Sequence, residues 1–112
     1  VHIDIGLKYQ ALASGEIDVT NAFTTDAQLA NPDTDLVTLE DAKHLQVNYF
    51  CSTVVRRDAL EKFPGLEEVL MQMDGILSDG EMAALNYQVE VGGRDERDAA
   101  RDFLLQKGLL EA

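Results

Sequence analysis

The segment that most constrains the fold of this chain is residues 15–26, where an apolar stretch typical of a buried strand gives way abruptly to polar side chains. Residues 17–19 predict the strand, and the residues after it supply hydroxyls, an amide, an aromatic ring and a carboxylate. In open α/β sheets, ligands bind in the crevice beyond the carboxyl ends of the strands. We therefore interpret the polar run after residue 19 as a ligand-contacting strand end.

Composition limits the class of protein and of partner. The chain has 112 residues, of which 46% are hydrophobic, enough for one domain with a core of modest size. Its formal net charge of −12 repels phosphate backbones and anionic lipid surfaces, so nucleic acid is not expected as a partner. The lone Cys51 cannot form an internal disulfide. The sequence contains no phosphate loop, zinc motif or nucleophile elbow, so we expect no cofactor, no metal and no enzyme activity.

The residue pattern predicts a mixed α/β first half. Apolar residues at helical spacing over 5–14, followed by Gly15 as a stop, predict a helix that leads into the first strand. The runs 36–39 and 45–55, which are apolar or rich in β-branched and aromatic side chains, predict two further strands.

The second half of the chain is predicted to be helical. Ser78 and Glu81 have the spacing of a capping box and predict a helix to about residue 90. A last helix is expected over 95–107, with Gly108 as its end. Two shorter helices are predicted at 58–62 and 64–73, the second with Pro64 in its first turn.

Several short motifs, taken in order, resemble the osmoprotectant-type substrate-binding proteins of ABC importers, which bind glycine betaine, choline, carnitine and related quaternary ammonium compounds. The resemblance covers nearly all of the chain. It implies the C-terminal portion of an α/β, type II periplasmic-binding-protein fold, in which two lobes clamp the ligand. The motifs that carry it are Leu7-Lys8-Tyr9-Gln10-Ala11-Leu12, Gly15-Glu16-Ile17-Asp18-Val19, Thr24-Thr25-Asp26, Asp41-Ala42-Lys43-His44, Val54-Val55-Arg56-Arg57-Asp58, Leu85-Asn86-Tyr87-Gln88-Val89 and Ala100-Arg101-Asp102-Phe103-Leu104.

The resemblance also implies how the chain is divided. Residues 1–43 would form the end of one α/β lobe, and residues 44–112 would cross the hinge and return as helices to the other lobe. Because family members are much longer, the two-lobed fold would be incomplete in this chain. An incomplete lobe exposes sheet edges and apolar surface, so we expect a homo-oligomer.

Ligand-binding roles follow from the same resemblance. A trimethylammonium group is held best by aromatic faces through cation–π attraction. The family has aromatic residues at the positions of Phe23 and Tyr49, so both are expected to be walls of the binding cage. The alternative for Phe23 is an ordinary core position beside Ala22.

The polar residues of the same segment have two interpretations each. Asn21, Thr24 and Thr25 could hydrogen-bond a ligand carboxylate or hydroxyl, or they could cap the helix or turn that begins near Asp26. Asp26 could face a cationic ligand, or it could cap a helix and pair with a basic group across the hinge.

The sequence thus supports the hypothesis of a non-catalytic protein that binds a quaternary ammonium solute and delivers it to an ABC permease. The resemblance places such proteins on the extracytoplasmic face of the cell membrane, as periplasmic proteins, lipoproteins or domains fused to the permease. The alternative is an acidic protein–protein interaction module with no small-molecule ligand.

Overall fold

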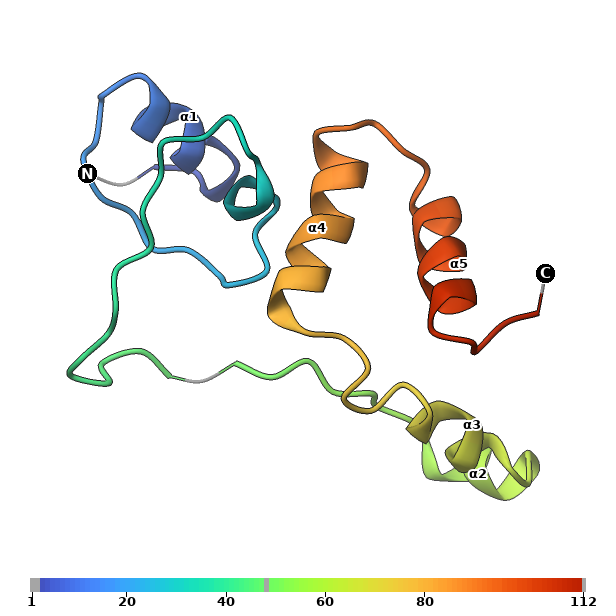
Figure 1. Ribbon diagram of the computed structural model, residues 1–112. Helices are drawn as coiled ribbons and strands as arrows, with labels where there is room; N and C mark the ends of the chain where they lie inside the picture. The colour runs from blue at the N-terminus through green and yellow to red at the C-terminus, as the bar shows by residue number, and fades with distance from the viewer. Residues whose placement is uncertain (1–2, 48, 112) are drawn as a thin grey trace.

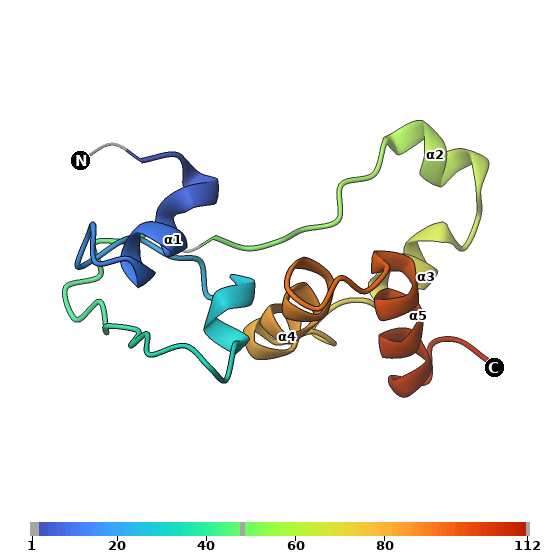
Figure 2. The ribbon, with the colours of Figure 1, turned by 90° about the horizontal axis from the view of Figure 1, so that it is seen from above.

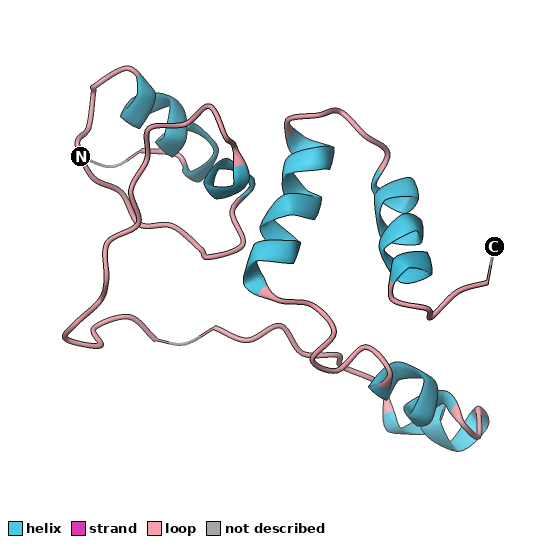
Figure 3. Ribbon diagram, viewed as in Figure 1, coloured by secondary structure: helices cyan, strands magenta, loops and turns pink. Residues whose placement is uncertain are grey.

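The computed structural model describes residues 3–47 and 49–111. Within these residues, helices alternate with loops (Figures 1 and 3). The elements are η1 (Ile5–Leu7), α1 (Lys8–Ala13), η2 (Ala27–Ala30), α2 (Arg57–Lys62), α3 (Leu66–Met71), α4 (Asp79–Glu90) and α5 (Glu96–Gln106), where η marks a 3-10 helix.

The strands predicted at 17–19, 36–39 and 45–55 do not form in the described part of the chain, and residue 48 lies outside it (Figure 3). A strand is stable only when its backbone groups pair with a neighbouring strand. Most of the apolar side chains of these segments instead face solvent, as Val37, Val47 and Phe50 show. The expected α/β character is therefore not seen in these residues, whereas the predicted helical second half is confirmed.

Two helices end as the sequence predicts, at glycines with positive φ. After α1, Gly15 has φ +74°, and its N–H donates to the Leu12 carbonyl at 3.1 Å while the Glu16 N–H donates to the Ala11 carbonyl at 2.9 Å. This pair of hydrogen bonds is a Schellman motif, and Gly108 ends α5 in the same way. The motif after α1 turns the chain sharply into the segment that carries the predicted site.

The capping box predicted for α4 is also confirmed. The Glu81 N–H donates to the Ser78 hydroxyl at 3.3 Å, and the Ser78 N–H donates to the Glu81 carboxylate at 2.9 Å. The expected role of Pro64 is wrong, because α3 begins two residues later. Gly65, with φ +89°, breaks the helical path between Pro64 and Leu66.

The arrangement of the elements is open. The radius of gyration is 17.7 Å, compared with about 13 Å for a typical globular domain of 100 residues. A long connection leads from the region of α1 and η2 to α2 and α3, which lie at the far end of the molecule, and the chain then returns along α4 (Figures 1 and 2). There α4 packs against η2 on one side and α5 on the other.

The buried apolar side chains of the described residues are all alanines, namely Ala11, Ala27, Ala83 and Ala99. Small side chains at these positions let η2, α4 and α5 approach closely, but they bury little apolar surface. The modest core expected from composition therefore does not form from large side chains here, and many of these remain exposed.

Candidate functional site

The predicted site residues lie on or next to one tight turn. The Asp26 N–H donates to the Phe23 carbonyl at 3.0 Å, which closes a β-turn with Thr24 and Thr25 at its two central positions. The Asp26 carboxylate in turn accepts the Phe23 N–H at 3.2 Å. Asp26 therefore holds both main-chain groups of Phe23. Asn21 stands exposed two residues before the turn.

Two side chains of α1 reach this turn. The Lys8 ammonium donates to Oδ2 of Asp26 at 2.8 Å, and the Tyr9 hydroxyl donates to the same oxygen at 2.5 Å. Lys8 is only 7% exposed, and the side chain of Asp26 is 20% exposed. Asp26 also precedes η2, but its side chain makes no capping hydrogen bond there. Side-chain capping by Asp26 is therefore absent, and its basic partner, Lys8, comes from the same predicted lobe rather than from across the hinge.

The protonation states of this cluster follow from its contacts. Burial raises the pKa of Asp26, but hydrogen bonds from Lys8, Tyr9 and the Phe23 N–H outweigh it, so this pKa lies below its ordinary value. Burial, together with the Asp26 carboxylate, raises the pKa of the Tyr9 phenol far above its ordinary value. At neutral pH Asp26 is therefore a carboxylate and the Tyr9 phenol is neutral.

The structure brings Phe23 and Tyr49 together, although they come from separate segments. Their ring centroids lie 6.0 Å apart with an interplanar angle of 72°, an edge-to-face arrangement. Phe23 is 45% exposed and Tyr49 is 83% exposed, so the core alternative for Phe23 does not hold. The Lys8 ammonium lies 5.6 Å from the centroid of Phe23 and 4.9 Å from that of Tyr9. The Phe23 ring thus already has a cation within cation–π distance.

A side chain from α4 holds the turn from another direction. The Asn86 amide donates to the Thr25 carbonyl at 2.8 Å. Beside this bond, α4 packs on η2, where Ala27 and Ala83 are buried. The backbone of the turn is therefore anchored to both α1 and α4. The sequence did not predict Lys8, Tyr9 and Asn86 as parts of the site. All three lie in the motifs that carry the family resemblance, and this was the one indication of a role for them.

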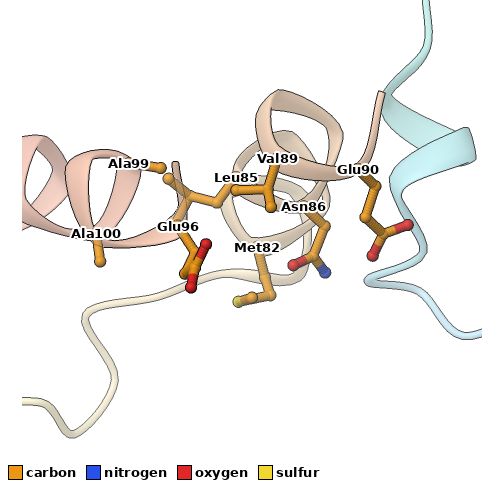
Figure 4. A pocket seen from close by; sticks show the side chains of 8 residues that line it. All are labelled: Met82, Leu85, Asn86, Val89, Glu90, Glu96, Ala99 and Ala100. Carbon is orange, nitrogen blue, oxygen red and sulfur yellow. The ribbon is translucent and has the colours of Figure 1, made fainter. Parts of the chain in front are cut away.

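A hollow lies between α4 and α5 (Figure 4). Its volume of about 190 Å³ is below the roughly 300–1,000 Å³ of typical small-molecule sites. The predicted site residues do not line it, but Asn86 does. The lining residues are Met82, Leu85, Asn86, Val89, Glu90, Glu96, Ala99 and Ala100.

Across 3–47 and 49–111, no three His, Cys, Asp or Glu side chains come together in a way that could hold a metal ion. Among the helices of this same part of the chain, none combines the length and the apolarity needed to cross a membrane.

Aromatic faces are the groups with which proteins hold quaternary ammonium ligands, and the rings of Phe23 and Tyr49 are both exposed. Residues 3–106 match the family described as the substrate binding domain of ABC-type glycine betaine transport systems, and the chain belongs to this family. The family predicted from the sequence is thus confirmed. It implies a periplasmic-binding-protein fold.

Curated relatives agree with the family. The chain is 37% identical over 107 residues, 96% of its length, to an ergothioneine transport permease/ergothioneine binding protein of Helicobacter pylori, and covers 19% of that protein. It is 29% identical over 109 residues to a carnitine transport binding protein of Listeria monocytogenes, and 30% identical over 109 residues to a glycine-betaine-binding protein of Pseudomonas aeruginosa. Each of these alignments takes in 97% of the chain, but only 35% and 34% of the respective relatives. The names of these relatives describe binding and transport rather than catalysis.

Proposed function

We propose that the protein to which this chain belongs binds a quaternary ammonium solute and passes it to an ABC permease, and that Phe23 and Tyr49 are walls of the solute site. The observation that carries the proposal is the edge-to-face contact of these two rings, at 6.0 Å, on exposed positions. A quaternary ammonium group has no N–H to donate, so ring faces are its natural partners.

The charges around the rings are compatible with a cationic group. Lys8 lies close to the Phe23 ring, but its charge is balanced by Asp26 at 2.8 Å. The neutral Tyr9 adds no charge to the cluster. An ammonium group at the exposed side of Phe23 would therefore meet a neutral cluster rather than an isolated positive charge.

The polar residues of the turn would complete the site. Thr24 and Asn21 are exposed and carry groups that can hydrogen-bond a solute carboxylate or hydroxyl. Thr25 would contribute in the same way from its half-buried position. We assign Asp26 to the support of the site, because its carboxylate already accepts three hydrogen bonds.

The proposal extends to the whole protein by family membership. The intact protein would have the two-lobed α/β fold, with residues 1–43 in one lobe and 44–112 crossing to the other, and would act without catalysis. It would work on the extracytoplasmic face of the cell membrane. A homo-oligomer remains a prediction, and sedimentation of the intact protein would test it.

The test is calorimetric titration of the intact protein with glycine betaine, choline, carnitine and ergothioneine, compared with its Phe23→Ala and Tyr49→Ala variants. Cation–π contacts contribute about 0.5–2 kcal/mol each, so loss of one ring should raise Kd by about 2- to 30-fold. Phe63→Ala is the matched control, because Phe63 is also exposed and has the Lys62 ammonium 5.2 Å from its ring.

The outcomes separate the hypotheses. Saturable binding that is weakened by the Phe23 and Tyr49 variants but not by the Phe63 variant would support the proposal and name the solute. Equal Kd values for all variants would refute the assigned site. No binding of any probe by the folded protein would favour the acidic interaction module.

A further inference from the structure

We propose that Lys8 and Tyr9 are positioning residues that fix the Phe23 ring through Asp26, without touching the solute. The inference rests on the proposed role of Phe23 in solute binding.

Asp26 holds the backbone of Phe23 through two hydrogen bonds. A β-turn with one backbone hydrogen bond leaves the amide of its first residue free. Here that amide donates to the Asp26 carboxylate at 3.2 Å, while the Phe23 carbonyl accepts the Asp26 N–H at 3.0 Å. The two bonds fix both sides of the Phe23 backbone, and thereby the direction in which its ring leaves the turn.

Lys8 and Tyr9 of α1 in turn hold the Asp26 carboxylate. Oδ2 of Asp26 accepts from Lys8 and from Tyr9 as well as from Phe23. Lys8 and Tyr9 are consecutive residues of α1, so this one helix supplies both side-chain donors to the carboxylate. Without them, Asp26 would be free to rotate toward water, and the bond to the Phe23 amide would compete with hydration.

Lys8 and Tyr9 support the ring rather than bind the solute. The Lys8 side chain is 9% exposed, and its ammonium already bonds to Asp26. The same ammonium lies 5.6 Å from the Phe23 centroid, so Lys8 holds the ring as well as the turn beneath it. The exposed side of Phe23 is left for a ligand.

The experiment uses the intact protein and its Tyr9→Phe and Lys8→Met variants. Two quantities are measured: the hydrogen-exchange rate of the Phe23 amide without solute, by NMR, and Kd for ergothioneine, carnitine and glycine betaine. Loss of one support should speed exchange of that amide about fivefold and raise Kd about 3- to 10-fold.

The controls remove the same groups elsewhere. Tyr87→Phe deletes a hydroxyl from a tyrosine of α4, and Lys62→Met removes an ammonium that contacts the Phe63 ring. Neither should change the exchange of the Phe23 amide or Kd. Lys8→Arg should restore both to within about threefold, since a guanidinium can pair with a carboxylate and stack on a ring.

Each outcome decides the inference. Faster exchange with weaker binding in Tyr9→Phe and Lys8→Met, restored in Lys8→Arg, supports it. Weaker binding with unchanged exchange of the Phe23 amide overturns it, because Lys8 and Tyr9 would then act on the solute directly. Unchanged exchange and unchanged Kd overturn it too. If the unsubstituted protein binds no probe, the proposed function fails, but the exchange rates still decide whether Lys8 and Tyr9 hold the turn.

Discussion

The substitution Asp26→Ala tests whether the cluster of Lys8, Tyr9 and Asp26 stabilises the folded protein. In Asp26→Ala, the ammonium of Lys8, whose side chain is 9% exposed, loses the carboxylate that neutralises it. Breaking a fully buried ion pair from one side costs about 3–5 kcal/mol. Because the Asp26 side chain is 20% exposed and water can reach the gap, we expect a lower cost, about 2–3 kcal/mol.

Substitution of Lys8, the partner of Asp26, should lower the free energy of unfolding by a smaller amount. Lys8→Met keeps the apolar stem of the side chain and leaves Asp26 with the Tyr9 hydroxyl and the Phe23 N–H as donors. We expect a loss of about 1 kcal/mol. The double variant has no unpaired ammonium, so it should cost clearly less than the sum of the two, with a coupling energy of about 1–2 kcal/mol.

The assay is urea denaturation of the intact protein at pH 7, followed by far-UV circular dichroism, for both single variants and the double variant. Asp58→Ala serves as the matched control, since Asp58 pairs with Arg56 at 3.2 Å but both side chains are exposed. Such a pair should contribute less than about 1 kcal/mol. The reasoning is refuted if Asp26→Ala costs no more than Asp58→Ala, or if the two substitutions in the cluster are simply additive.

The stability contribution of Asp26 should decrease as pH is lowered. The pKa of Asp26 is lower in the folded protein than its ordinary value of 3.8, so its contribution is present above pH 3.8 and disappears as pH falls through the folded value. The difference in stability between the unsubstituted protein and Asp26→Ala should therefore shrink in acid below pH 3.8. A difference that grows in acid would contradict the assignment.

Two predictions concern α4. Gly92→Ala places a Cβ 2.6 Å from the Gln88 carbonyl oxygen and should destabilise the protein by about 1–3 kcal/mol, whereas Gly80→Ala, which meets open space, should stabilise it by about 0.5–1 kcal/mol; thermal melts of both variants check the contrast. Hydrogen bonds from Lys107 and from the cap of α4 lower the pKa of Glu81 from 4.5 to about 2, so its stabilising contribution is present above pH 4.5 and is lost as pH falls toward 2. NMR titration of the Glu81 carboxyl should show a midpoint near 2 that rises in Lys107→Met, and an unchanged midpoint would contradict the role of that pair.

The local features of the helices could be predicted because a few adjacent residues encode them. The Ser78 hydroxyl and the Glu81 carboxylate form their capping box within one turn, and Gly15 and Gly108 adopt backbone angles that other residues avoid. The segments 36–39 and 45–55 could not be predicted in this way. Their β-branched and aromatic residues favour strands, but a strand also needs a partner that local sequence does not supply.

The family, the net negative charge, the helical second half and the segment that holds Phe23 and Asp26 could all be predicted from the residues. The contacts of Lys8 and Tyr9 with Asp26, and of the Phe23 ring with the Tyr49 ring, became visible only in the folded chain. This is because a cap or a helix stop is complete within a few residues. An ion pair or a ring contact between distant segments depends on the path of the chain between them, and no local spacing specifies that path.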